Sequence, residues 1–137
     1  MSTAGLTKDS GWEVGVSKTL QYSVPELWDL LTSPNGLTLW LGEGAELAVG
    51  SRYETADGTT GEVRSYREHD RIRVTWQPAD WSHDSTVQLA LSGSGPKTVL
   101  RFHQERLADA DERTRQRTHW QDVMTTVIER LGSDRGQ

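Results

Sequence analysis

The chain has 137 residues, the usual length of one domain, and 34% of them are hydrophobic, which is enough for one core. Its formal net charge of -5 makes nucleic acid and anionic membrane surfaces unfavourable partners, because like charges repel. The absence of cysteine excludes disulfides, thiolate metal sites and cysteine nucleophiles. Since the sequence has neither a signal-peptide core nor a membrane-length apolar run, we expect a cytoplasmic protein.

The two ends of the chain are small and polar. We therefore expect a flexible leader over residues 1–11 and a flexible tail over 133–137, with one domain over 12–132 between them. The first segment of that domain, 12–22, alternates apolar and polar residues, with Lys18 as the exception. Because side chains alternate between the two faces of a strand, this pattern predicts a half-buried strand.

Two short helices are expected after this strand. Ser23 and Glu26 have the spacing of a capping box, which predicts the start of the first helix. The Pro-Asn-Gly sequence at 34–36 should interrupt that helix. A second helical turn over 37–41 should then carry Trp40.

Turn sequences divide the middle of the chain into short apolar segments. Gly, Asp and Asn tolerate positive φ and Pro cannot continue a strand ladder, so each such sequence marks a strand end. Segment 61–68 alternates poorly, which indicates a bulge or an edge position. Short turns between consecutive strands favour an antiparallel meander. The expected strands are 45–49, 52–56, 61–68, 72–77, 85–92 and 97–105.

The clearest element is a long amphipathic helix near the C-terminal end. Acidic residues precede arginines in 109–117, which suits the helix dipole, so the helix should begin near Asp109. It should run to about Leu131, where Gly132 provides a stop. Its apolar stripe must be buried, and the concave face of the sheet is the available surface, which predicts an α+β fold. The stripe consists of Trp120, Val123, Met124, Val127, Ile128 and Leu131.

This order of elements resembles the START-like (SRPBCC) superfamily, and within it the family of heat-shock-protein-90 ATPase activator homologues. Four sequences carry the resemblance over roughly residues 12–131: EVGVSKTLQYSVPELWDLL, SPNGLTLWLG, RIRVTWQPADW and HWQDVMTTVIERL. The resemblance implies a helix-grip fold, in which a curved antiparallel sheet of about six to seven strands wraps around a long C-terminal helix, with two short helices after the first strand. In some members the fold encloses a cavity open to small apolar ligands.

Histidines are the first candidates for chemistry. A metal site would combine His103 and Glu105, which share a strand face, with His119, but no metal-binding spacing is present. An acid–base pair could use His103, Glu105 or Asp84 near a cavity mouth, although most acids lie beside arginines or in turns, where they stay solvated. The sequence has no nucleophile elbow and no phosphate loop. We therefore predict no metal, no cofactor and no catalytic residue, and leave enzymatic activity open.

Tryptophan is the most informative residue type, with 6 in the chain beside a single phenylalanine. Trp and Tyr combine a large apolar body with one polar group, which suits a pocket for a flat apolar molecule. Each residue taken alone fits a packed core better, but the set predicts a ligand cavity between the sheet and the C-terminal helix. The predicted cavity residues are Trp28, Trp40, Tyr53, Tyr66, Trp76, Trp81, Leu89, Phe102, Trp120 and Met124.

Arginines on the expected strands leave two alternatives. Arg64, Arg73 or Arg101 could point inward and hold a ligand carboxylate or phenolate through the planar guanidinium. They could equally lie on the solvent face and pair with Glu on neighbouring strands.

The sequence thus supports three functions. The first is binding of a small hydrophobic or aromatic molecule by a monomer or homodimer, with neither nucleic acid nor membrane as a partner. The second, implied by the resemblance alone, is a co-chaperone-like module that contacts a chaperone or another protein. The third is a cyclase or hydrolase that uses an acid or a histidine in the cavity.

Overall fold

The computed structural model describes residues 6–7 and 11–135, with side chains over 11–132; the other residues of the expected leader and tail lie outside it. Three helices and seven strands make up this part of the chain. In order, they are β1 (Leu6–Thr7), β2 (Gly11–Leu20), α1 (Val24–Thr32), α2 (Pro34–Trp40), β3 (Arg52–Glu54), β4 (Thr60–Arg67), β5 (Arg71–Trp76), β6 (Ser85–Ser94), β7 (Lys97–Leu107) and α3 (Ala110–Arg135).

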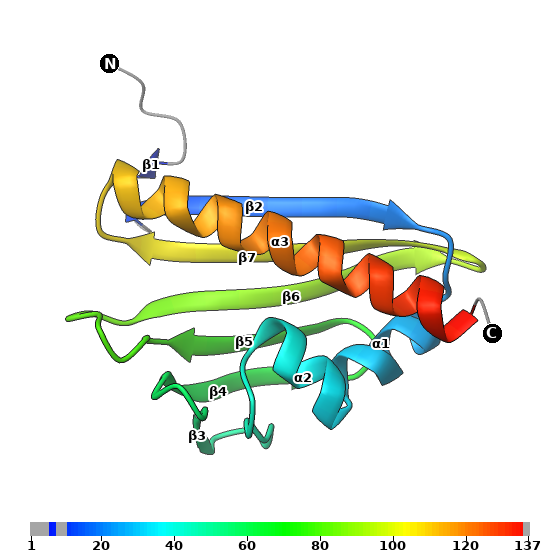
Figure 1. Cartoon of the computed structure of the whole chain (residues 1–137), viewed down its shortest axis with the longest axis horizontal. Helices are drawn as coiled ribbons and strands as arrows, with labels where there is room; N and C mark the ends of the chain where they lie inside the picture. The colour runs from blue at the N-terminus through cyan, green and yellow to red at the C-terminus, as the bar shows by residue number, and fades with distance from the viewer. Residues whose placement is uncertain (1–5, 8–10, 136–137) are drawn as a thin grey trace.

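The strands form one 7-stranded sheet in the order β1-β2-β7-β6-β5-β4-β3. Every neighbouring pair is antiparallel. The long helix α3 crosses one face of the sheet, and α1 and α2 lie beside it on the same face (Figure 1). This arrangement confirms the predicted α+β fold, with an antiparallel sheet around a long C-terminal helix and two short helices after β2.

Strand β2 follows the alternation seen in the sequence. Val14 and Leu20 are buried, whereas Ser17 and Thr19 are exposed. Strand β1 was not predicted, because an alternating apolar and polar pattern cannot be recognised in two residues. It pairs with Gly11 and Trp12 at the start of β2.

The two short helices meet closely. Ser23 and Glu26 form the predicted capping box of α1. The second helix begins earlier than predicted, at Pro34, because Ser33 caps it by accepting a hydrogen bond from the Gly36 amide. A side chain at Gly36 would lie 1.7 Å from the Leu30 carbonyl oxygen, so this close contact requires glycine.

One predicted strand is wrong, and one prediction about strand shape is confirmed. Residues 45–48 have no regular structure, and their neighbourhood is held by turn bonds such as Ser51 amide to Ala48 carbonyl, 2.9 Å. The apolar spacing there reflects the packing of a loop rather than a ladder. Strand β4 contains the expected irregularity, a register shift between Val63 and Ser65. It is an inner strand, because β3 pairs with its other side.

Helix α3 has the predicted start but not the predicted end. The Asp109 carboxylate accepts a hydrogen bond from the Glu112 amide, 2.7 Å, and so caps the first turn. Gly132 does not stop the helix, which continues to Arg135, so residues 133–135 of the expected tail are helical. An exposed glycine in a helix costs only about 1 kcal/mol relative to alanine, which does not force an end.

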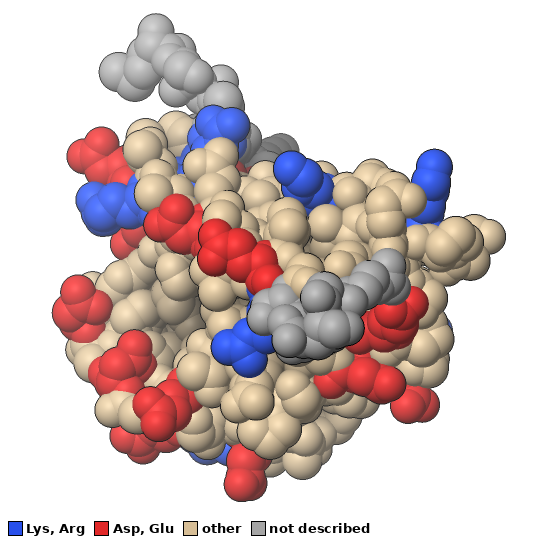
Figure 2. All heavy atoms as spheres, turned by 45° about the vertical axis from the view of Figure 1, so that its right-hand side comes forward, with Lys and Arg blue, Asp and Glu red and all other residues tan. Residues whose placement is uncertain are grey.

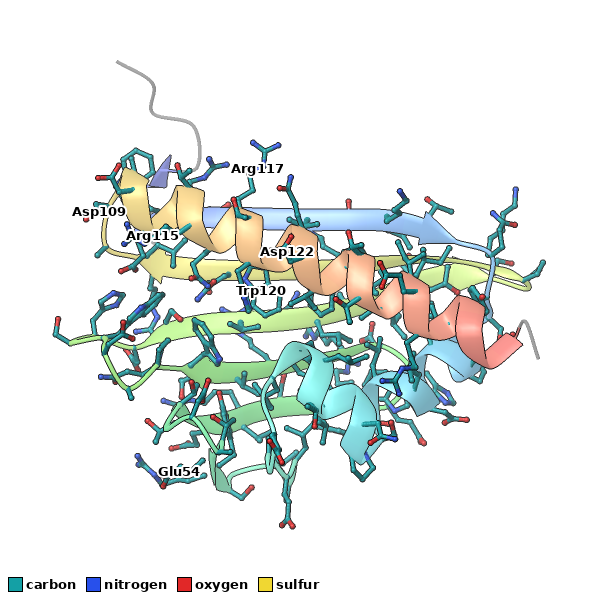
Figure 3. The ribbon with its side chains drawn as sticks, in the orientation of Figure 1. Glu54, Asp109, Arg115, Arg117, Trp120 and Asp122 are labelled. Atoms are coloured by element: carbon teal, nitrogen blue, oxygen red, sulfur yellow. The ribbon has the colours of Figure 1, made fainter. Side chains whose placement is uncertain are left out.

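The core lies between α3 and the inner face of the sheet. Trp120 points from α3 toward the strands, whereas Arg117 points away from them (Figure 3). Trp120 and Val127 are fully buried, and Leu89 and Phe102 meet them from β6 and β7. Within the described part of the chain, none of the helices combines the length and apolar character needed to cross a bilayer.

Candidate functional site

A pocket of about 170 Å³ opens where the C-terminal end of α2, the helix α3 and the end of β5 approach one another. We call it the Trp76 pocket. The space-filling view shows the molecule hollowed below α3, with acidic side chains along the rim (Figure 2). The pocket is lined by Thr38, Leu39, Trp40, Leu41, Gly42, Asp57, Thr59, Trp76 and His119.

Aromatic rings extend from this pocket in two directions under α3. Trp76 and His119 stack with centroids 5.9 Å apart. Toward the core, His119 meets the edge of Trp120 at 4.7 Å, and Trp120 stacks on Phe102 at 5.0 Å. Toward the surface, Trp76 meets the edge of Trp81 at 5.3 Å. The pocket therefore lies at the point where packed aromatic core gives way to solvent.

A buried polar network supports the core side of this row. The Gln104 side-chain oxygen accepts hydrogen bonds from Trp120 Nε1, 2.9 Å, and from the Gln116 amide, 3.0 Å. The Gln104 amide donates to Ser85 Oγ, 2.9 Å, and Ser85 Oγ donates to the Trp76 carbonyl, 2.8 Å. Each of these buried side chains has a partner, which fixes the Trp120 ring in place.

The pocket side differs, because two ring nitrogens there lack partners. Trp76 Nε1 and His119 Nε2 are buried and make no hydrogen bond to any residue that the structure describes. Burial lowers the pKa of His119, and the nearby Asp122 charge opposes this only in part. The imidazole is therefore neutral at pH 7. An unmet buried donor costs about 1–3 kcal/mol, so the described residues leave this side of the aromatic row less stabilised than the Trp120 side.

An ion pair joins α3 to the β5–β6 loop, outside the pocket lining. His83 Nε2 lies 2.9 Å from a Glu112 carboxylate oxygen, and Glu112 also accepts from the Ala108 amide at 3.0 Å. Burial lowers the pKa of His83, but its hydrogen bonds to the Asp84 carbonyl and Glu112, with the two carboxylate charges, raise it above its ordinary value overall.

Asp57 brings a negative charge to the pocket wall. Its carboxylate accepts hydrogen bonds from the Thr55 hydroxyl and the Thr59 amide. These bonds lower the pKa of Asp57, so the group is ionised at neutral pH.

The predicted cavity residues divide into several groups. Trp40 and Trp76 line the Trp76 pocket. Trp28 forms an edge-to-face pair with Tyr66 at 5.4 Å in a separate aromatic cluster. The Tyr53 hydroxyl donates to the Thr75 carbonyl, and burial raises the pKa of this phenol. Among the other predicted residues, Trp81 is half-buried, and Leu89, Phe102, Trp120 and Met124 are buried in the core.

The polar candidates outside this set do not reach the pocket. His103 and Glu105 face outward from β7, since their neighbours Phe102 and Gln104 are the buried residues. His103 lies 3.6 Å from Glu13 on the outer face, across the sheet from His119, so the metal alternative is not assembled. No group of three potential metal ligands gathers anywhere in residues 6–7 and 11–135.

The strand arginines also take the solvent alternative. Arg73 pairs with Glu105 and donates to Gln88 across the strands, 3.2 Å. Arg64 pairs with Glu62 at 3.3 Å on the same outer face. None of the three arginines considered as inward anchors lines the Trp76 pocket.

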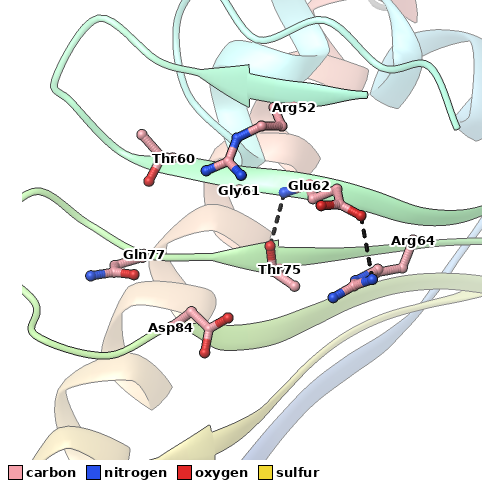
Figure 4. A pocket seen from close by; sticks show the side chains of 8 residues that line it. All are labelled: Arg52, Thr60, Gly61, Glu62, Arg64, Thr75, Gln77 and Asp84. Atoms are coloured by element: carbon pink, nitrogen blue, oxygen red, sulfur yellow. Dashed lines mark hydrogen bonds and ion pairs between the residues drawn. The ribbon is translucent and has the colours of Figure 1, made fainter. Parts of the chain in front are cut away.

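A separate polar pocket of about 230 Å³ lies on this outer face, with the strands between it and α3 (Figure 4). Asp84, proposed for a cavity mouth, lines this pocket instead and pairs with Arg106 at 3.0 Å. A third hollow of about 470 Å³ lies between α2 and residues 43–47. Neither hollow is lined by any of the predicted cavity residues.

Sequence reasoning missed His119 as a pocket residue and Gln104 as its buried neighbour. A signal for His119 is present in the helix, because Glu112, Gln116 and His119 extend the apolar stripe toward the N-terminus at the same helical spacing. Polar residues on the buried face of a helix indicate a site or a network. For Gln104, only its place between inward-facing residues of a strand could have indicated burial.

Comparisons with known structures support the fold. DynU16, a protein of the dynemicin biosynthetic locus, matches with a TM-score of 0.77 and 22% identity over 89% of this chain; the chain spans about half of DynU16, 48%. An HSP90 activator from Plasmodium falciparum matches with a TM-score of 0.75 and 22% identity, over 89% of this chain and 97% of that one. CalU16 from Micromonospora echinospora matches at 0.74 and 20% identity, over 85% and 73%. No curated protein sequence matched the chain.

An antiparallel sheet around a long C-terminal helix, with two short helices after β2, defines a helix-grip domain. A family model described as "Activator of Hsp90 ATPase homolog 1-like protein" matches residues 21–132. The chain belongs to this family.

Proposed function

We propose that this protein binds a small hydrophobic or aromatic molecule in the Trp76 pocket. The observation that carries the proposal is that the rings of Trp40, Trp76 and His119 together line a pocket of about 170 Å³. Indole and imidazole rings offer flat apolar contact.

The packed-core alternative explains other parts of the aromatic set better than it explains this one. Trp120 is fully buried, and its indole nitrogen bonds to Gln104 at 2.9 Å, as a core tryptophan requires. Trp76 is 8% exposed, lies on a pocket wall and has no such acceptor. The difference favours a ligand contact for the Trp76 ring over a purely packed role.

Two other functions remain as alternatives. Family membership and the fold shared with the Plasmodium falciparum HSP90 activator support a co-chaperone-like interaction module, although 22% identity supports the fold alone. An enzyme of cyclase or hydrolase type would use His119, whose neutral imidazole could accept a proton at the pocket.

A thermal-shift panel of small apolar and aromatic compounds tests the proposal. A true ligand should stabilise the fold by about 2.7 kcal/mol at a hundred times its Kd. Leu39→Trp should remove the shift by filling the Trp76 pocket, because Leu39 lines it. Leu47→Trp is the matched control, since Leu47 lines only the neighbouring hollow.

Loss of the shift in Leu47→Trp with retention in Leu39→Trp would place the ligand elsewhere and contradict the proposal. Native mass spectrometry of the purified protein would identify any molecule that it retains. Absence of every shift, together with saturable binding of purified Hsp90, would favour the interaction module. Turnover of a bound compound that disappears in His119→Phe would favour the enzyme.

A further inference from the structure

The lining of the Trp76 pocket changes from buried and apolar to exposed and polar. Trp40, Leu41 and Trp76 are buried. Thr38 and Asp57 line the same pocket but are exposed. A ligand there therefore meets aromatic and aliphatic surface at its inner end and polar, solvated groups at its outer end. A molecule with one apolar end and one polar end matches this gradient.

The charge at the mouth of the pocket is negative. Asp57 is ionised at neutral pH and is the one acidic residue in the lining, and no Lys or Arg lines the pocket within the part of the chain that the structure describes. Asp57 also forms no ion pair with any of these described residues. The imidazole of His119 is neutral at pH 7, so it does not repel a cation. The lining therefore attracts a cationic group and repels an anionic one.

Hydrogen bonds fix the Asp57 carboxylate in place. It accepts from the Thr55 hydroxyl and from the Thr59 amide, the latter at 3.2 Å. Both threonines are buried, so the turn that carries Asp57 is anchored on the core. A charged group that the fold already holds loses little conformational freedom when it binds a partner, which favours binding.

The volume limits the size of the ligand. The Trp76 pocket holds about 170 Å³. An apolar cavity of about 150 Å³ in another protein accommodates benzene. One aromatic ring with a short polar substituent therefore fits, and the burial gradient places the substituent toward the mouth.

We propose that the ligand is a single aromatic ring bearing a short-chain ammonium group, with the ring against Trp40 and Trp76 and the ammonium paired with the Asp57 carboxylate. This inference rests on the proposed function and specifies its ligand class. Because the Asp57 carboxylate is exposed and solvent screens it, the ion pair should raise the affinity only about three- to fivefold.

The test is an amide NMR titration of ¹⁵N-labelled protein at pH 7 and low salt with benzylammonium, benzyl alcohol and benzoate. Benzylammonium should bind about three- to fivefold more tightly than benzyl alcohol, which has the same ring and nearly the same size but no charge. Benzoate should bind more weakly than benzyl alcohol. The advantage of benzylammonium should shrink in about 1 M NaCl, where the Debye length is about 3 Å. The Thr59 amide resonance should shift more with benzylammonium than with benzyl alcohol, because this amide donates to Asp57.

Three variants locate the effect. Asp57→Asn keeps an oxygen that can accept from Thr55 and Thr59 but removes the charge, so benzylammonium and benzyl alcohol should bind it equally. Asp29→Asn is the matched control, since it removes an exposed carboxylate from α1, outside the pocket lining, and should keep the preference. Leu39→Trp should weaken the binding of all three ligands by filling the pocket.

The outcomes separate this inference from the proposal on which it rests. If benzyl alcohol binds in a manner sensitive to Leu39→Trp and benzylammonium gains nothing over it, this inference is wrong and the proposed function stands. The same holds if the gain persists in Asp57→Asn, or if none of the three probes binds while another compound of the thermal-shift panel does. If no compound binds, or if Leu39→Trp leaves all binding unchanged, both are wrong.

Discussion

Trp76 and Trp120 lie side by side under α3, with ring centroids 6.4 Å apart, yet they have opposite surroundings. Trp120 is fully buried, stacks on Phe102 and donates to Gln104. Trp76 lies at the pocket wall with its donor unmet. The row of aromatic rings therefore has a packed end, at Trp120 in the core, and an open end, at Trp76 beside the pocket.

The difference depends on what the neighbouring strands and α3 provide. Around Trp120, strand β7 supplies Gln104, and α3 supplies Gln116, so the polar atoms bind one another. Around Trp76, α3 supplies His119, whose Nε2 also has no partner among the described residues. A satisfied network rigidifies a core, whereas the Trp76 end lacks that network and borders a pocket.

The largest effect is expected from a substitution that disrupts the hydrogen-bond network around Trp120. Gln104→Leu should destabilise the fold by about 3 kcal/mol, because it leaves Trp120 Nε1, the Gln116 amide and Ser85 Oγ with fewer partners inside the core. Urea denaturation measures the change. The control is Gln88→Leu on the outer face of β6, where the side-chain oxygen accepts from Arg73 and should contribute under 1 kcal/mol. Equal losses for the two variants would contradict the role given to Gln104.

The sequence predicted most of the fold because local patterns determined it. The alternation in β2, the capping box at Ser23 and the stripe from Trp120 each depend on neighbouring residues and were confirmed. The expected strand at 45–49 failed, because its apolar spacing also suits a loop that packs against the core. The continuation of α3 past Gly132 was missed, because an exposed glycine signals an end without enforcing one.

Less of the candidate site than of the fold could be predicted from the sequence. Trp76 and Trp120 carry the same periodic signal in their elements, so the sequence alone gives no reason to separate them. The two tryptophans differ in their contact with Gln104, whose side-chain oxygen accepts a hydrogen bond from the Trp120 indole and not from Trp76. In the sequence, Gln104 is 16 residues from Trp120 and 28 from Trp76. Such long-range pairing is a property of the folded arrangement, and whether the larger predicted aromatic set encloses a ligand stays a prediction.

A smaller effect is expected when the indole donors of Trp76 and Trp120 are removed one at a time. Trp76→Phe and Trp120→Phe remove similar volumes, but only the second breaks a buried hydrogen bond and leaves the Gln104 oxygen with Gln116 as its one remaining donor among the described residues. We expect Trp120→Phe to be more destabilising by about 1 kcal/mol. Chemical denaturation of both variants in ligand-free protein measures the difference. Comparable destabilisation would mean that Trp76 Nε1 is satisfied in solution, and the contrast between the two ends would fail.

The smallest effect concerns the two histidines at the open end, which should respond to pH in opposite directions. The pKa of His83 is raised in the folded protein, so its stabilising contribution is complete below the ordinary value of about 6.5 and is lost as pH rises through the folded pKa. The pKa of His119 is lowered, so its contribution is present above 6.5 and is lost as pH falls through the folded pKa.

A double-mutant cycle isolates the His83 part. Glu112→Gln retains an oxygen for the Ala108 amide but removes the charge next to His83, and His83→Gln completes the cycle. The coupling should be a few tenths of a kcal/mol at pH 5.5, since the His83 side chain is 31% exposed and solvent screens the pair. It should be smaller at pH 8, because the imidazole loses its charge as pH rises through the folded pKa of His83. A coupling that is unchanged or grows between these two pH values would show that the contact between His83 and Glu112 is not an ion pair.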